Sequence, residues 1–166
     1  MASGDTLCWL HPYGSEPPSA NYATQDVRNG HPVLDFDAAT DESACWTAYL
    51  PANYAGGGLT VIIEWAATSA TSGTCRWDAA IERIDDEGLD IDADSFAAVQ
   101  SVGAAAPATS GMVQYSSIAF TSGAQMDSLA AGELFRLKLT RDADGTGGTD
   151  DMTGDAEVLG VTIKET

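Results

Sequence analysis

Two segments with alternating apolar and polar residues, 58–68 and 74–84, constrain the fold of this chain most. Each carries four apolar residues, one of them a tryptophan, at every second position: Leu59, Val61, Ile63 and Trp65 in the first, and Cys75, Trp77, Ala79 and Ile81 in the second. Side chains alternate across a strand, so this period predicts two strands that each bury one face. The small and polar residues 69–73 between them predict a hairpin that brings both tryptophans into one core.

The same pattern continues along the chain and predicts an all-β fold. Further strands are expected at 6–10, 33–36, 43–50, 96–102, 111–120, 134–141 and 157–164. Turns rich in Gly, Pro or Asp separate them, which is typical of a sandwich or barrel. Helix is expected only as a turn or two within 124–131. We therefore expect an antiparallel two-sheet β-sandwich with jelly-roll-like topology. Its core would depend on a few large side chains: Trp9, Trp46, Trp65, Trp77, Phe36, Phe96, Phe120 and Phe135.

The first 30 residues differ from the rest of the chain. Pro12, Pro17 and Pro18 exclude a helix and a central strand there. We expect an extended N-terminal arm or edge segment over residues 1–30, of the kind that docks on a neighbouring subunit or on its own domain. Residues 31–166 would form the single sandwich domain, since 166 residues suit one domain better than two.

The net charge of −18, from 25 acids and 7 bases, limits the partners of the protein. Such a chain repels phosphate groups, which argues against nucleic acid and anionic membranes as partners. No run approaches the roughly 18 apolar residues of a membrane helix, and residues 1–5 do not begin a signal peptide. The three cysteines, Cys8, Cys45 and Cys75, show no metal-binding spacing and are expected to be free thiols.

An acidic stretch, 85–94, contains the residues best spaced for a metal ion. Asp90, Asp92 and Asp94 have the spacing of the first calcium ligands in an EF-hand loop. The later positions depart from that motif, because Ser95 replaces its glycine and Ser101 its bidentate acid. Calcium at these aspartates is therefore one interpretation, and a solvated acidic loop is the other. The Gly-rich acidic loop 142–151 is a second place for calcium.

Nothing in the chain forms a recognisable catalytic motif. The two histidines, His11 and His31, each precede a proline and have no nucleophile at a suggestive spacing. No pair among the 25 acids stands out as a glycosidase pair. The sequence thus predicts a protein that is not an enzyme.

The aromatic residues allow two interpretations. A sugar-stacking platform would need its tryptophans on loops or outward faces, whereas Trp46, Trp65 and Trp77 all lie on apolar strand faces and are expected in the core. Four other aromatics are freer to form a contact surface, because aromatic side chains are favoured in interfaces. These are Trp9, Tyr13, Tyr22 and Tyr54.

The chain resembles a group of small virion-associated proteins of tailed bacteriophages and prophages. The resemblance lies in four segments: 34–84, 90–102, 126–144 and 154–166. These proteins look like head decoration proteins, head fibres or similar β-sandwiches. The resemblance covers about four fifths of the chain and transfers no catalytic or ligand residues. It implies a structural role in the virion, synthesis in the host cytoplasm and assembly into a homo-oligomer, with a trimer favoured.

Taken together, the residues and the resemblance predict a non-enzymatic virion protein that decorates or cements a capsid. Its partners would be the major capsid protein and sister subunits. The alternative is a carbohydrate-binding or adhesin module of a phage fibre or tail tip, with or without calcium. A secreted β-sandwich enzyme or accessory domain is the third class, which the missing signal peptide and catalytic motif disfavour.

Overall fold

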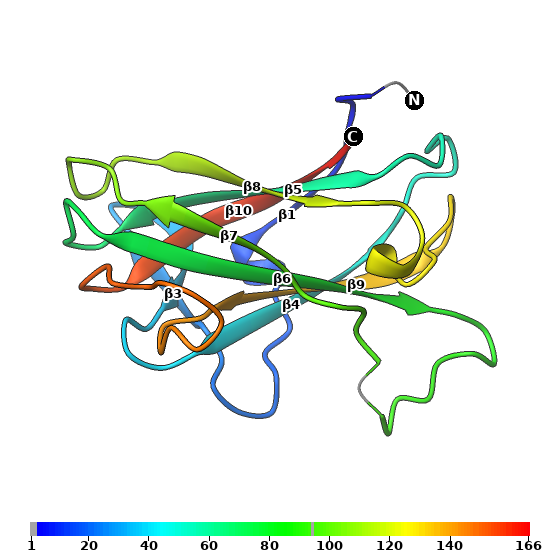
Figure 1. Cartoon of the computed structure of the whole chain (residues 1–166), viewed down its shortest axis with the longest axis horizontal. Helices are drawn as coiled ribbons and strands as arrows, with labels where there is room; N and C mark the ends of the chain where they lie inside the picture. Colours follow the sequence, from blue (N-terminus) through cyan, green and yellow to red (C-terminus); the bar gives the residue numbers. More distant parts are fainter. Residues whose placement is uncertain (1–2, 94) are drawn as a thin grey trace.

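The structure, a computed structural model, describes residues 3–93 and 95–166, and these form two antiparallel sheets packed face to face (Figure 1). The predicted two-sheet β-sandwich is confirmed. No helix in these residues is long and apolar enough to cross a membrane. Two 3₁₀ turns occur, η1 at Pro12–Gly14 and η2 at Ala124–Met126, the second within the stretch where a helical turn was expected.

Sheet A has six strands, and β10 is one of its central strands. The order is β2 (Thr24–Arg28), β3 (His31–Phe36), β10 (Ala156–Glu165), β5 (Leu59–Ala67) and β8 (Gln114–Phe120), and β1 (Thr6–Leu10) also pairs with β10. One edge of β10 pairs with β5 along its whole length. Its other edge is shared, because β3 pairs with residues 156–158 and β1 with residues 161–164.

Sheet B has four strands and forms the opposite layer. The order is β4 (Glu42–Tyr49), β9 (Leu134–Arg141), β6 (Thr74–Ile84) and β7 (Gln100–Ala105). Residues of β9 alternate between a buried and a half-buried environment, as expected for a strand with one face in the core.

The two tryptophan strands β5 and β6 do not form the predicted hairpin. β5 pairs with β10 and β8 in sheet A, whereas β6 pairs with β7 and β9 in sheet B. Residues 68–73 therefore cross from one sheet to the other. The prediction of a shared core is confirmed, because Trp65 and Trp77 are fully buried with ring centroids 5.7 Å apart at 68°. The strands face each other across the core instead of lying side by side.

The segment 1–30 contributes two strands to sheet A. β1 was expected from the sequence, whereas β2 was not. Leu10 of β1 is buried in the core, and β2 pairs with β3 from Thr24↔Asp35 to Arg28↔His31. Of the large side chains expected in the core, Trp9 and Phe96 lie outside it: Trp9 is half exposed, and Phe96 lies outside the buried core on the outer face of sheet B.

Candidate functional site

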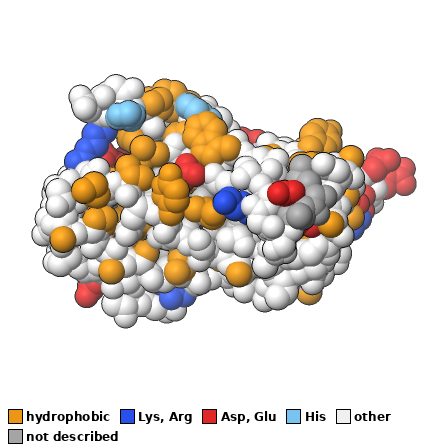
Figure 2. All heavy atoms as spheres, turned by 90° about the horizontal axis from the view of Figure 1, so that it is seen from above, with side chains coloured by type: hydrophobic (Ala, Val, Ile, Leu, Met, Phe, Trp, Pro, Cys, Tyr) orange, Lys and Arg blue, Asp and Glu red, His pale blue; other side chains and the backbone are white. Residues whose placement is uncertain are grey.

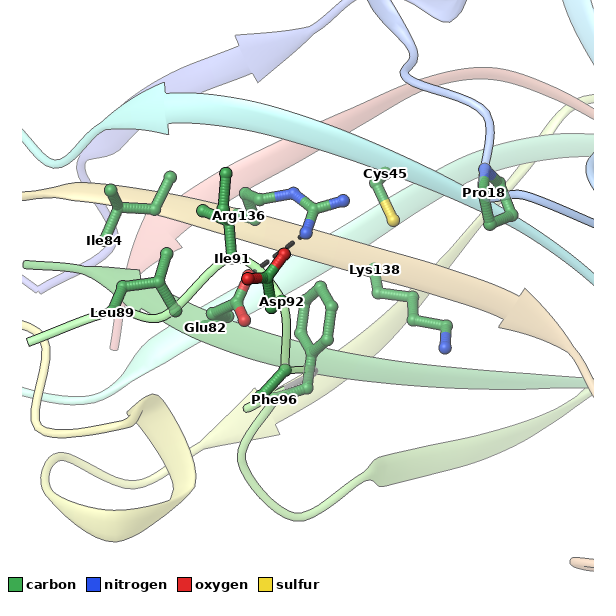
Figure 3. Close-up of a pocket in the computed structure, with 11 residues that line it drawn as sticks. Pro18, Cys45, Glu82, Ile84, Leu89, Ile91, Asp92, Phe96, Arg136 and Lys138 are labelled. Atoms are coloured by element: carbon green, nitrogen blue, oxygen red, sulfur yellow. Dashed lines mark hydrogen bonds and ion pairs between the residues drawn. The ribbon is translucent and has the colours of Figure 1, made fainter.

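A groove of about 440 Å³ lies on the outer face of sheet B, and we call it the sheet B groove. Its floor comes from the neighbouring strands β4, β9 and β6. The segment before β2 borders it at Pro18, and the loop between β6 and β7 covers the other border (Figure 3). The side chains that give it its chemical character are Glu82, Ile91, Asp92, Phe96, Arg136 and Lys138.

The basic side chains of the floor follow from the alternation of β9. Phe135, Leu137 and Leu139 point into the core and are fully buried. Arg136 and Lys138 therefore point outward into the groove. Arg136 pairs in register with Glu82 of β6, and their side chains form an ion pair with Nη1 and Oε2 3.1 Å apart.

Glu82 anchors the loop that covers one side of the groove. Its side chain is nearly fully buried, and its Oε1 accepts hydrogen bonds from Ser95 N at 3.2 Å and Ser95 Oγ at 3.0 Å. Its Oε2 accepts the bond from Arg136. A buried carboxylate with these three donors is satisfied, so Glu82 acts as a structural tie between sheet and loop.

Phe96 forms the aromatic wall of the groove, although the sequence placed it in a strand. β7 begins only at Gln100, because Ala97 N instead donates to Ile81 O at 2.8 Å and holds this part of the loop beside β6. The Phe96 ring lies 5.3 Å from Arg136 Cζ and 5.6 Å from Lys138 Nζ, which are cation–π distances. The loop thus places an aromatic ring over the two cations.

The N-terminal border of the groove is fixed by an isolated β-bridge. Glu16 N donates to Cys45 O at 2.7 Å, and Cys45 N donates to Glu16 O at 3.1 Å. The Glu16 carboxylate also lies 3.5 Å from Arg136 Nε. Arg136 is thereby balanced by two carboxylates. Lys138 makes no ion pair within the described ranges 3–93 and 95–166.

The groove can therefore hold a ligand that has both apolar faces and hydrogen-bonding edges. Phe96 and Ile91 supply apolar surface, Lys138 supplies N–H donors, and the exposed Asp92 carboxylate supplies acceptors. Neither His11 nor His31 lines it.

The predicted calcium residues are only partly described. Asp90 and Asp92 are exposed on the β6–β7 loop, where Asp92 N donates to Asp90 Oδ1 at 3.0 Å. Asp94 lies outside the described residues. Calcium binding by these three aspartates stays a prediction.

The structure brings together a different set of carboxylates, Asp41, Asp142 and Asp144, whose oxygens lie within 4.8 Å of one another. Asp142 and Asp144 belong to the acidic loop 142–151, the second place predicted for calcium. Asp41 joins them from the loop between β3 and β4. Burial raises the pKa of Asp142, whose Oδ2 also lies 3.0 Å from Arg76 Nε. Carboxylate oxygens suit a hard cation such as calcium, and these three would supply part of the six to eight oxygen ligands that it takes.

Three of the four predicted contact aromatics are exposed. Trp9, Tyr13 and Tyr22 keep 50%, 42% and 51% of their surface accessible. Tyr54 is buried and its hydroxyl donates to Gly57 O, so its prediction as a surface contact is wrong for this fold. Figure 2 looks onto the sheet A side of the sandwich, where apolar side chains gather.

The sequence missed the groove itself. The alternation of residues 134–141 places Arg136 and Lys138 on one face of a strand, but nothing in the sequence indicates that the loop between β6 and β7 folds back over them. One signal was present in the sequence: Glu82 is an acid at an outward position of a strand. Its partner Arg136 lies on a strand that is distant along the chain, so no local pattern could identify the pair.

Comparison with known proteins shows the fold. No family model and no curated protein sequence matches the chain. A CBM36-1 domain of a multidomain xylanase from the hindgut metagenome of Trinervitermes trinervoides superposes with a TM-score of 0.55 and 11% identity, covering 96% of this chain and 97% of the domain. A family 35 carbohydrate binding module from an environmental isolate gives 0.56 and 12%, with 96% and 98% covered.

A third similar structure is a larger enzyme. The isomalto-dextranase of Arthrobacter globiformis T6, complexed with panose, gives a TM-score of 0.52 and 14% identity. The match covers 92% of this chain but only 24% of that enzyme. At these identities the similarity establishes a shared β-sandwich architecture.

Proposed function

We propose that this protein is a non-catalytic carbohydrate-binding module that holds a neutral glycan in the sheet B groove. The observation that carries the proposal is the lining of the groove, where the Phe96 ring stands beside the hydrogen-bonding groups of Lys138 and Asp92. Binding sites for small ligands combine apolar surface with a few polar groups in this way.

The fold supports the same proposal. Two sandwiches of almost the same extent are carbohydrate-binding modules by their descriptions, and a third forms part of an enzyme that was studied with panose. The alternative of the sequence analysis, a carbohydrate-binding β-sandwich, is therefore better supported than capsid decoration. None of these three structures is described as a virion protein, so decoration rests on the resemblance alone.

The charge of the molecule favours a neutral ligand. A net charge of −18 repels polyanions, and in the groove Arg136 is paired with Glu82 and Glu16, while the Asp92 carboxylate also lines it. A sugar hydroxyl can bind groups of either charge, because it donates a hydrogen bond to a carboxylate and accepts one from the Lys138 ammonium.

The test is affinity gel electrophoresis of the intact protein through a panel of neutral polysaccharides, including xylan, dextran, mannan and mixed-linkage glucan. We expect retardation by at least one of them, and we expect Phe96→Ala and Lys138→Met to weaken it roughly tenfold, the effect of about 1.4 kcal/mol. Tyr49→Ala removes an exposed aromatic outside the groove and should leave binding unchanged. Migration unaffected by every polysaccharide would contradict the proposal.

A further inference from the structure

Trp9 lies with the Nε1 edge of its ring close to the backbone of sheet A. A Cβ atom added to Gly160 would lie 2.5 Å from Trp9 Nε1 and 2.7 Å from both Cε2 and Cζ2. These three atoms form one edge of the indole, so this edge lies against Gly160. Gly160 thus provides the space in which the indole packs, and half of the Trp9 surface remains exposed.

A fixed carboxylate stands at the edge of this ring. Trp9 Nε1 donates to Glu64 Oε2 at 2.9 Å, and Thr162 Oγ1 donates to Glu64 Oε1 at 2.6 Å. Each carboxylate oxygen keeps a free lone pair after these bonds. Glu64 is therefore oriented by the protein and still able to accept further hydrogen bonds.

A second exposed ring lies on the other side of Glu64. Tyr115 of β8 is the cross-strand partner of Glu64, and 71% of its surface is accessible. Directly opposed residues have Cβ atoms about 5 Å apart. Glu64 is thus flanked by Trp9, to which it is hydrogen bonded, and by the neighbouring Tyr115.

The aromatic side chains continue beyond Trp9 along the same face. The His11 ring stands edge-on to Trp9 with centroids 5.4 Å apart, and the Tyr13 ring stands edge-on to His11 at 5.7 Å. Tyr13 is held in place because its hydroxyl donates to Asp26 O at 2.8 Å. We call Tyr13, His11, Trp9, Glu64 and Tyr115 the aromatic strip; Figure 2 shows the apolar side chains and the histidines on this side of the molecule.

We propose that the aromatic strip is a second glycan-binding surface, on the sheet opposite the groove, where sugar rings stack on Trp9 and Tyr115 and their hydroxyls bind Glu64. An exposed ring that is already ordered loses little conformational entropy when a pyranose face covers it. The ordered carboxylate between the rings matches hydroxyls at the edge of a sugar. The net charge again excludes a polyanion, and a charged side chain at the centre of the strip disfavours a dry protein interface.

This inference rests on the proposed carbohydrate-binding function and extends it to two independent surfaces. Sheet A and sheet B form opposite layers of the sandwich, so one ligand molecule in the groove leaves the strip free. A long polysaccharide bound at both surfaces would be held with greater avidity than at either alone.

The test compares strip and groove variants of the intact protein in the same affinity gels. We expect Trp9→Ala, Tyr115→Ala and Glu64→Gln each to weaken retardation at least fivefold. Phe96→Ala should remove the contribution of the groove to retardation, and the double variant Trp9→Ala/Phe96→Ala should abolish retardation. Tyr49→Ala is the matched control, an exposed tyrosine on sheet B. Because Trp9 packs on Gly160 and its loss could unfold the protein, Tyr115→Ala, whose side chain is mostly exposed, decides in that case.

The outcomes separate the two proposals. Full binding by both Trp9→Ala and Tyr115→Ala, with loss in Phe96→Ala, would overturn the strip and leave the groove. A wild-type protein that binds none of the polysaccharides would overturn both. A wild-type oligomer that Tyr115→Ala converts to monomers, without any change in retardation, would show that the strip is an interface between copies.

Discussion

Arg141 is a charged residue at a position where the alternation of β9 places a core side chain. It is fully buried, and its Nε and Nη2 donate to the two carboxylate oxygens of Asp150 at 3.0 and 2.9 Å. Its remaining N–H groups donate to Phe36 O, Gly154 O and Met152 O. Arg141 thus orders the loop between β9 and β10 from inside the sandwich.

We expect Arg141→Ala to lower the free energy of unfolding by about 3–5 kcal/mol, because it leaves the buried Asp150 carboxylate without its partner. Urea denaturation followed by tryptophan fluorescence measures this. Arg83→Ala is the control, since Arg83 is a partly exposed arginine whose salt bridges should contribute far less to stability. Equal effects of the two substitutions would contradict the assignment.

Asp35 gives the protein a pH-dependent stability. Burial, followed by repulsion from Asp155 and Glu157, raises the pKa of Asp35 from its ordinary value of 3.8 to about 6. The folded state therefore holds this proton between pH 4 and 6, where the unfolded chain has lost it. The stabilisation present below pH 4 is lost as the pH rises through 6.

We expect Asp35→Asn to match the wild-type melting temperature at pH 4 and to exceed it at pH 7.5. Solvent screening of this partly exposed group limits the gain to about 1 kcal/mol. The measurement is thermal unfolding by circular dichroism at several pH values, with Asp86→Asn as an exposed control. A difference that is the same at both pH values would argue against titration of Asp35.

At the scale of strands, residue pattern predicted the elements better than their partners. The alternation around Trp65 and Trp77 marks β5 and β6 correctly, but a period of two says only which face is buried. It cannot distinguish a hairpin from two strands that face each other across a core. Likewise, β2 carries four exposed residues among its five, so it shows no buried face for a pattern to detect.

The pairing of β1 and β2 makes the N-terminal segment part of the fold. Deleting residues 1–28 should lower the melting temperature markedly, because it exposes the edge of β10 and removes Leu10 from the core. Deleting residues 1–5 is the control. A truncated protein that melts like the full chain would show that the segment is a detachable arm, as one interpretation of the prolines suggested.

The acidic loops can be distinguished by one metal titration. If the sequence prediction holds, calcium raises the melting temperature and Asp90→Asn/Asp92→Asn removes that rise. If Asp41, Asp142 and Asp144 hold the ion, the rise persists in that variant and disappears in Asp142→Asn/Asp144→Asn. The spacing of Asp142 and Asp144 was visible in the sequence, whereas Asp41 joins them only through folding, about 100 residues away along the chain.

For the whole molecule, the resemblance to phage proteins predicts a homotrimer. Light scattering of the purified protein, with calcium and with chelator, measures its mass directly. A trimer under both conditions would support a virion component that also binds glycans, such as a fibre module. A monomer would contradict the predicted trimer and leave both glycan surfaces intact.

The burial of three tryptophans and the exposure of the fourth give the protein an intrinsic optical probe. Trp46, Trp65 and Trp77 are at most 2% exposed, whereas Trp9 is 50% exposed. Caesium ions, cationic quenchers that the acidic surface does not repel, should therefore quench the red-shifted emission of Trp9 alone. A sugar stacked on that indole would shield it from the quencher. A titration of unlabelled protein would therefore report occupancy of the aromatic strip and would not respond to a ligand in the sheet B groove.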